Sequence, residues 1–427
     1  MNSILTKILL LFLSILIIIA CSTYMPTVSN RNVSYIYNPS STVIHPEYMV
    51  HHNKDTSSLL FVKINTDELL FIYQGDDDNN EGGEKARVRI HYCVYSSFNS
   101  KDVLDSISKI YILDKSNIKN YFVTSVPFKA RDSLKYSLEV ITTDLMRMKA
   151  DRKFLFIDKS SENGRQNFML TSSDEERLPY FRKYCRSNES FRIEHRNGYK
   201  KLFIKYYSKE FGFPLPPYSV APVRPVSIMP DSIWEYSRND TLDFTLKHAG
   251  IYHVQADTSQ KEGLTLFNFG ENFPRTKTPV ELLKPLRYLS TKKGYRELEM
   301  YASKKLAVDE FWLKASGNAD RAKELIRIYY SRIMFANLYF TSHTQGWNTD
   351  RGMIYTVFGA PGTIYKSDDS ERWVYGENTA SMIFQFEKVE NPYSDNHYVM
   401  KRNETYKLTW YQAVDTWRNG RVYSVAN

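Results

Sequence analysis

The chain has 427 residues, of which 42% are hydrophobic, 15% are aromatic and 25% are charged, and its formal net charge is +9. This length exceeds what one hydrophobic core usually serves, so we expect two or three domains. The basic residues do not form the kind of block that marks a nucleic-acid-binding arm, which excludes nucleic acid as an expected partner.

The N-terminal residues have the order of an export signal. Lys7 precedes an apolar run, which ends at Ala20 and Cys21. A charge, a short apolar run and a small residue before a cysteine are typical of a bacterial lipoprotein signal. We therefore predict a signal peptide over 1–20 and lipidation of Cys21 by fatty acyl chains such as palmitate. An uncleaved transmembrane anchor is the alternative, but the run is short against the about 20 residues that a span needs.

The lipid anchor makes a membrane surface the first expected partner. The residues after Cys21 carry no acidic cluster that would indicate export to the cell exterior. We therefore expect the protein in the outer membrane, facing the periplasm rather than the cell surface. Residues 21–46 are rich in Ser, Thr, Asn and Pro and predict a flexible tether.

The next segment, 47–160, has the alternation of apolar and polar residues that β-strands show. One predicted strand places Val88, Ile90, Tyr92 and Val94 on a single face. Short strands separated by turns predict a β-sandwich-like domain. The other predicted strands include Leu60 to Ile64, Leu69 to Tyr73, Tyr121 to Val126, Tyr136 to Ile141 and Phe154 to Ile157.

A second β-rich domain is predicted over 161–276. Prolines are dense between Phe213 and Pro230, and they cannot lie inside a central strand. This segment therefore predicts an extended connector, with a ligand for a proline-recognition site as the alternative. The predicted strands are Phe191 to His195, Leu202 to Tyr207, Leu242 to Leu246, Ile251 to Ala256 and Leu264 to Phe269.

The last part, 277–427, changes to a helical pattern and then returns to strands. Thr278 and Pro279 predict a helix start, and Pro285 a kink soon after it. The predicted helices are Val280 to Leu289, Gly294 to Lys314 and Asp320 to Phe340, and the predicted strands are Met353 to Phe358, Arg372 to Tyr375, Met382 to Phe386 and Tyr406 to Tyr411. The predicted fold class is thus mainly β with α+β: two β-sandwich-like domains, a helical segment and a C-terminal α+β module.

A corner between the third helix and the following strand holds the main candidate site. Its glycines permit backbone angles closed to other residues, and Trp347 supplies a large anchor. Asp350 and Arg351 are neighbours, so in an extended chain they point to opposite sides and bond different partners. We expect backbone amides for Asp350 and carbonyls or a carboxylate for Arg351. The candidate structural or binding corner comprises Gly346, Trp347, Thr349, Asp350, Arg351, Gly352, Gly359, Pro361 and Trp373.

This corner resembles the GWxTD-domain family of bacterial envelope lipoproteins. The motif is Gly346-Trp347-Asn348-Thr349-Asp350, and the resemblance covers about 278 to 390. It implies an exported lipoprotein with β domains ahead of a helix-plus-sheet module, and it implies no reaction. Family members commonly carry an acidic residue where Gly362 stands, which argues against a role for a carboxylate there. We predict a structural role for the corner in preference to a catalytic one.

Neither a metal nor a cofactor is predicted. The acidic loop from Gly75 to Glu84 fails as an EF-hand, because Val88 occupies the twelfth position. His51 and His52 are expected in a solvated loop. Cys93 and Cys185 lack metal-site spacing, and they either pair after export or stay separate thiols.

The expected function is that of an outer-membrane-anchored lipoprotein. We predict a non-enzymatic structural or adaptor component of an envelope complex, such as one that assembles outer-membrane proteins or secretes proteins. Its expected partners besides the membrane are other envelope proteins. The alternative is a glycan-binding or glycan-processing lipoprotein that uses Asp350 and Glu371 across an aromatic-lined cleft. A third hypothesis is that the tail end of the chain binds peptides by strand addition at an exposed edge.

Overall fold

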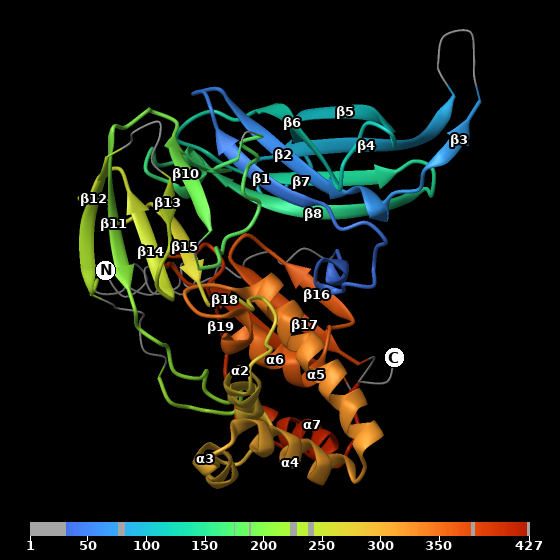
Figure 1. Ribbon diagram of the computed structural model, residues 1–427, viewed down its shortest axis with the longest axis vertical. Helices are drawn as coiled ribbons and strands as arrows, with labels where there is room; N and C mark the ends of the chain where they lie inside the picture. Colours follow the sequence, from blue (N-terminus) through green and yellow to red (C-terminus); the bar gives the residue numbers. More distant parts are fainter. Residues whose placement is uncertain are drawn as a thin grey trace, which may run out of the picture.

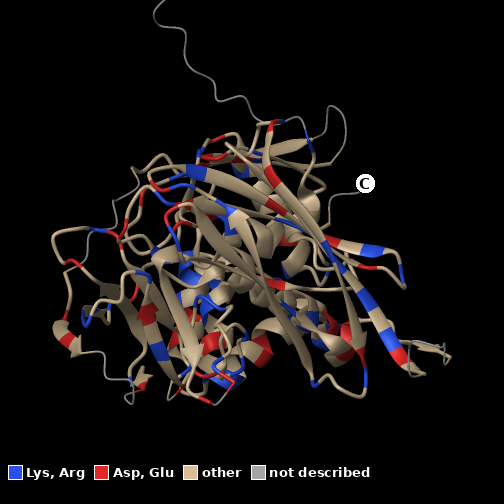
Figure 2. Ribbon diagram, turned by 90° about the horizontal axis from the view of Figure 1, so that it is seen from above, with Lys and Arg blue, Asp and Glu red and all other residues tan. Residues whose placement is uncertain are grey.

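The computed structural model describes residues 31–424 apart from 76–81, 175, 188, 223–228, 238–242 and 377–380. The predicted signal peptide, Cys21, the first part of the predicted tether and most of the acidic loop lie outside the described residues. The predicted fold class is confirmed, because several antiparallel sheets precede a C-terminal α+β region (Figure 1). Basic and acidic residues are interspersed along the described ribbon (Figure 2).

The first β domain consists of two antiparallel sheets packed on one core. Every second residue of β4 is buried, including Val88, Ile90 and Val94, which fulfils the predicted alternation. One sheet has the order β1(Glu47–His52), β2(Ser57–Asn65), β6(Tyr121–Lys129). The other contains β3(Ile72–Gln74), β4(Gly83–Tyr95), β7(Lys135–Asp144) and β8(Lys149–Asp158), with β5(Val103–Asp114) on the remaining edge of β4, and η2(Thr66–Glu68) precedes β3.

Two histidines of this domain correct a prediction. His51 and His52 lie at the end of β1, where they are 8% and 0% exposed, and not in a solvated loop. His52 bonds through its ring nitrogens to Ser58 Oγ at 2.8 Å and to the carbonyl of Asp158 at 3.1 Å. These partners make burial of the ring possible.

The second β domain is also built from two sheets. Its core is formed by alternate residues of the central strands, such as Leu202, Ile204 and Val254. Arg196 joins it to the first domain through two hydrogen bonds to Asp132, at 2.9 and 3.2 Å. One sheet has the order β13(Phe244–Thr245), β10(Ser190–His195), β9(Phe168–Ser172), preceded by η3(Arg165–Asn167). The other has the order β12(Ser232–Ser237), β11(Lys201–Tyr207), β14(Gly250–Gln255), β15(Leu264–Asn268).

The helical segment begins where the sequence predicts it. Thr278 and Glu281 form a capping box at α2(Pro279–Leu283), and the chain then tightens into η4(Lys284–Tyr288) at Pro285. The single helix predicted from Gly294 to Lys314 is wrong, because Tyr301 is extended and Ser303 caps a new helix. The helices are α3(Lys292–Met300), α4(Lys304–Ser316) and α5(Ala319–Phe340).

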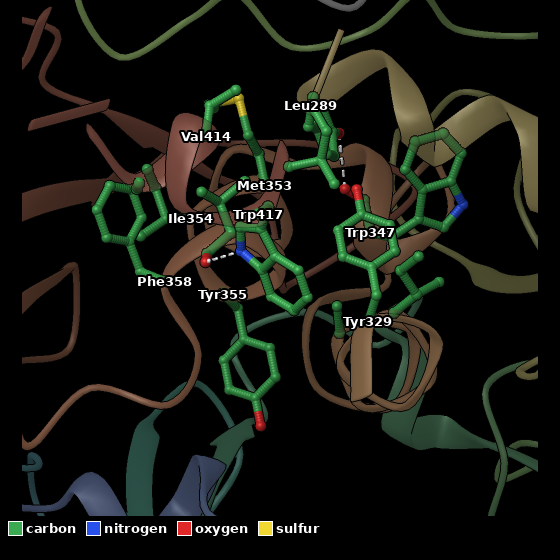
Figure 3. Close-up of a cluster of buried hydrophobic side chains, with 14 of the residues drawn as sticks. Leu289, Tyr329, Trp347, Met353, Ile354, Tyr355, Phe358, Val414 and Trp417 are labelled. Atoms are coloured by element: carbon green, nitrogen blue, oxygen red, sulfur yellow. Dashed lines mark hydrogen bonds between the residues drawn. The ribbon is translucent and has the colours of Figure 1, made fainter. Parts of the chain in front are cut away.

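The C-terminal module packs two further helices against a four-stranded antiparallel sheet. The strands predicted near Arg372 and Met382 are confirmed, but those predicted over 353–358 and 406–411 are wrong because both segments are helical. Figure 3 shows side chains from α5, α6 and α7 converging in the core. The sheet order is β16(Thr363–Lys366), β17(Ser370–Tyr375), β18(Met382–Lys388), β19(Tyr398–Met400), and the remaining elements are η5(Gly346–Asn348), α6(Asp350–Phe358) and α7(Tyr406–Arg418).

Part of the predicted tether belongs to this module. Residues 31–46 do not form a free tether, because η1(Ser34–Tyr37) packs into the module core, where Val33 and Tyr37 are 0% and 8% exposed. The amide of Val33 also donates to the carbonyl of Ile364 at the edge of β16, over 2.9 Å. The part of the segment from Val33 to Tyr37 is thus a structural part of the C-terminal module, whereas Ile44 packs in the core of the first β domain.

Three further observations limit the possible chemistry. Cys93 and Cys185 are both free thiols, so of the two alternatives the separate thiols hold. In the described part of the chain, His, Cys, Asp and Glu residues form no group of three or more that could hold a metal. The helices of the described residues are all too short or too polar to cross a bilayer.

Candidate functional site

Two glycines of the corner are required by close approach of backbone segments. A Cβ at Gly346 would lie 2.0 Å from the carbonyl oxygen of Ala336 on α5, and a Cβ at Gly352 would lie 1.8 Å from that of Gly346. Neither glycine has a positive φ, so the expected reason, unusual backbone angles, is wrong. The motif instead places η5 directly against the end of α5 and α6 directly against η5.

The threonine of the motif begins α6. Thr349 Oγ1 accepts a hydrogen bond from the amide of Gly352 at 3.0 Å and donates one to the carbonyl of Gly346 at 2.7 Å. It is therefore the N-cap, and Asp350 lies in the first turn of the helix, where a negative charge is favourable. Asp350 and Arg351 thus diverge on a helix and not along a strand.

Trp347 fixes η5 to its surroundings through all of its polar groups. Its amide donates to Asn337 Oδ1 at 3.1 Å, and its carbonyl accepts from the hydroxyl of Tyr288 at 2.8 Å. Its ring nitrogen donates to Gln345 Oε1 at 2.7 Å. The indole is 4% exposed, so other parts of the chain cover it in this structure.

Asp350 binds the end of β19, the last strand of the sheet. Its Oδ2 accepts from the amide of Met400 at 2.8 Å, and its Oδ1 pairs with Arg402 at 2.5 Å. The predicted backbone-amide partner is thus confirmed. The side chain is buried, and this burial raises its pKa although Arg402 and the Met400 amide act in the opposite direction.

Arg351 is turned to the opposite side and is 1% exposed. One end of the guanidinium donates to Glu371 Oε1 at 3.0 Å, and the other donates to the carbonyl and the side-chain oxygen of Asn396, at 2.9 Å for the carbonyl. Its central carbon lies 3.9 Å from the ring centroid of Tyr398. The expected carbonyl and carboxylate partners are therefore confirmed.

Glu371 is the centre of a buried charge network. Its Oε1 accepts from Arg351, from Lys366 at 2.6 Å and from the hydroxyl of Tyr37 at 2.7 Å, while its Oε2 accepts from the indole of Trp373 at 3.0 Å. Burial opposes ionisation, but Lys366 and Arg351 outweigh it and lower the pKa of the Glu371 carboxyl to about 2. We refer to Tyr37, Arg351, Lys366, Glu371 and Trp373 as the Glu371 network.

The turn after α6 completes the corner. Gly359 has φ +88° and its carbonyl accepts from the hydroxyl of Tyr375 at 2.8 Å. A side chain at this left-handed position would be strained, which explains the glycine. Pro361 is buried beside it, so the predicted corner residues are brought together in one region.

This geometry does not supply the cleft that glycan processing requires. Asp350 and Glu371 belong to separate sets of partners, and both are buried with their oxygens bonded. A general acid or base must reach the substrate proton. The Glu371 network therefore joins helices to the sheet, and its members satisfy the hydrogen bonds of the Glu371 carboxylate.

The sequence interpretation missed several residues of the site. Tyr37, Lys366, Asn396 and Arg402 come from segments outside the motif, and their pairing could not be read from local spacing. The start of α6 did carry a signal, because Thr349 followed by Asp350 is a typical N-cap sequence.

Comparison with known proteins agrees with this architecture. Residues 250–419 match the family model of the GWxTD domain. This range begins at β14, includes the described α-helices from α2 to α7 and ends just after α7. No curated protein matches the chain. The protein thus carries a GWxTD domain in its C-terminal part.

Proposed function

We propose that the protein is a lipoprotein of the outer membrane that serves as a non-enzymatic structural or adaptor component of an envelope complex. The proposed complex is one that assembles outer-membrane proteins or secretes proteins. The proposal is carried by the inward orientation of the corner: Asp350, Arg351 and Glu371 are 8%, 1% and 1% exposed. Loss of one partner from such an enclosed ion pair destabilises a fold, and enclosed charged groups are poorly placed for attack on a substrate.

The sheet edge at β5 supports contact with another protein. Among the described strands β5 pairs only with β4, and Leu104, Ile110 and Ile112 on it are 51%, 50% and 65% exposed. Arg87 and Arg89 on β4 lie opposite Ile112 and Ile110 in the ladder. Such an edge favours an added strand with apolar and acidic side chains. The C-terminal sheet is less open, because Val33 bonds to β16.

The membrane part of the proposal rests on Cys21 and the apolar run before it. Cys21→Ser removes the sulfur that would carry the lipid, so we expect the variant to move from the membrane fraction to the soluble fraction. Cys93→Ser is the matched control and should stay with membranes. Equal membrane association of wild type and Cys21→Ser would contradict the lipoprotein proposal.

The adaptor part is tested by purification of the solubilised full chain after cross-linking in cells. We expect the same envelope protein to copurify with wild type in each preparation and to be lost from the double variant Ile110→Lys, Ile112→Lys. Leu408→Lys changes a side chain that is 68% exposed on α7 and serves as the control. A chain that is consistently purified alone would count against an adaptor.

A further inference from the structure

The connection between β11 and β12 is much longer than its topology requires. The two strands are antiparallel neighbours, with Tyr206 opposite Ser232, and residues 208–231 join them. Hairpin strands of this kind usually need two to five residues. The base of the connection is closed, because Asp231 donates its amide to the carbonyl of Tyr206 at 2.8 Å and accepts from Ser208. Long loops in compact domains are usually functional.

The described tip of this connection lies against the GWxTD domain. Figure 1 shows the chain leaving β11 and running to the region of α2. Residues 211–218 have the sequence Phe-Gly-Phe-Pro-Leu-Pro-Pro-Tyr, and we call them the proline arm. They cross the outer side of the corner, next to Trp347 and Asn348.

The domain donates hydrogen bonds to the backbone carbonyls of the arm. Asn348 Nδ2 donates to the carbonyls of Phe211 and Gly212, both at 3.3 Å. Arg402 Nη2 donates to the carbonyl of Leu215 at 3.1 Å, and the amide of Asn403 donates to that of Pro217 at 3.1 Å. An extended proline-rich chain lacks internal hydrogen bonds, so its carbonyls are free to accept such donors.

Aromatic side chains of the arm contact aromatic rings of the domain near both ends of the arm. The ring of Phe213 lies 5.9 Å from those of both Trp347 and Tyr295, measured between centroids. The ring of Tyr218 lies 5.5 Å from that of Tyr411, and the two hydroxyls are 3.1 Å apart. We call the surface formed by Tyr295, Trp347, Asn348, Arg402, Asn403 and Tyr411 the aromatic groove.

The arm leaves part of the groove's hydrogen-bonding capacity unused. Arg402 is 7% exposed in its side chain, and its Nε and Nη1 have no hydrogen-bond partner among the described residues. The same is true of Asn348 Oδ1. Buried polar atoms without partners cost free energy, and the arm does not satisfy every polar atom of the two side chains that bind it.

We propose that the aromatic groove is a recognition site for extended proline-rich segments, occupied in cis by the proline arm and taken by such a segment of a partner protein when the arm leaves. Proline-rich ligands are generally bound in grooves lined by aromatic side chains. Here Asn348, Arg402 and Asn403 also donate hydrogen bonds to the carbonyls of the arm. Asp350 of the GWxTD motif acts here as a positioning residue. Its carboxylate pairs with Arg402, which donates to a carbonyl of the arm. The aromatic groove shares no residue with β5.

The test removes the arm and restores its sequence as a free peptide. Replacement of residues 208–231 by Asn-Gly closes the hairpin with a short turn, and calorimetry then measures binding of the peptide Phe-Gly-Phe-Pro-Leu-Pro-Pro-Tyr. The intact chain is protected by its own arm, whose effective concentration is in the millimolar range. We expect the shortened chain to bind the peptide at least tenfold more tightly than the intact chain does.

Three comparisons define the chemistry of the groove. A peptide with alanine in place of its three prolines should bind the shortened chain at least tenfold more weakly. Asn348→Ala in the shortened chain removes a donor to two carbonyls and should also weaken binding about tenfold, which corresponds to about 1.4 kcal/mol. Lys407→Ala, an exposed position at the start of α7, should leave the affinity unchanged.

Each outcome decides the proposal. A folded shortened chain that binds the peptide no better than the intact chain, or binds the alanine peptide equally well, overturns it. An intact chain that dimerises by exchange of arms, seen by light scattering and lost in the shortened chain, assigns the groove to a second copy and overturns the partner assignment. Loss of peptide binding with retained copurification refutes the groove and leaves the adaptor function standing.

A second variant serves if the shortened chain does not fold. Phe213→Ala in the intact chain removes the ring that lies between Trp347 and Tyr295, so the arm should be released more often. We expect faster proteolysis near Val220, which is 77% exposed, together with a gain of peptide binding. Faster proteolysis without peptide binding would overturn the proposal.

Discussion

Replacement of Glu371 by glutamine tests the physical role of the buried charge network. The carboxylate compensates Arg351 and Lys366, whose nitrogens lie 3.0 and 2.6 Å from it, inside a core formed by Tyr37 and Trp373. Glutamine keeps the size and loses the charge, so two cations remain without their counter-charge. Removal of one partner of a buried ion pair typically costs about 3–5 kcal/mol.

The pKa of Glu371 gives an independent magnitude. A pKa held at about 2 instead of the ordinary 4.5 corresponds to about 3 kcal/mol, at about 1.4 kcal/mol for each pH unit. Because the folded-state pKa is the lower one, this stabilisation is fully present above about pH 4.5 and is lost as the pH falls toward 2. Glu371→Gln should therefore lose stability at pH 7 and show a flatter decline between pH 4.5 and 2.

Urea unfolding followed by tryptophan fluorescence measures this effect in the right domain, because every tryptophan except Trp234 lies within residues 250–419. Glu387→Gln on the neighbouring strand is the matched control. Its pair with Lys401 is more than half exposed on both sides, so its loss should cost less than about 1 kcal/mol. Equal midpoints for Glu371→Gln and Glu387→Gln, with the same decline in acid, would refute the reasoning.

Three further outcomes are expected. Gly346→Ala should cost about 3 kcal/mol or more in urea unfolding, because its Cβ would lie 2.0 Å from Ala336 O, whereas Gly75→Ala has open space and should be neutral. Thr349→Val should cost about 1 kcal/mol through loss of the N-cap, and Thr349→Ser should restore most of it; identical melting of both would contradict the cap. Tyr37→Ala should release residues 31–46 and expose them to proteinase K, and continued resistance would contradict their docking.

Where the sequence interpretation was right, the local spacing of apolar residues determined the structure. The alternation in β4 and the run of apolar residues at helical spacing in α5, from Leu325 to Phe340, each describe one buried face and one exposed face. The GWxTD motif could also be found from the sequence, because Gly346, Trp347 and Asp350 lie close together in the chain. Even the partner types of Asp350 and Arg351 followed from their chemistry.

Where the sequence interpretation was wrong, the segment is buried on all sides. Its sequence therefore shows no periodic alternation of apolar and polar residues. Each residue of α6 is buried, so its apolar run resembled a strand, although Thr349 before it and Gly359 after it were helix signals. η1 was assigned to a tether because its surroundings are polar in sequence. Tyr37, one of its two aromatic residues, bonds to partners more than three hundred positions away.

The sequence by itself determined the β-rich class, the start of the helical segment and the position of the GWxTD corner, because these depend on neighbouring residues and on periods of two or 3.6. Only the tertiary structure decided that Asp350 and Glu371 are enclosed by cations and that the proline arm lies across the corner. Those contacts join segments distant in the chain, and they depend on packing and desolvation, which no local pattern encodes.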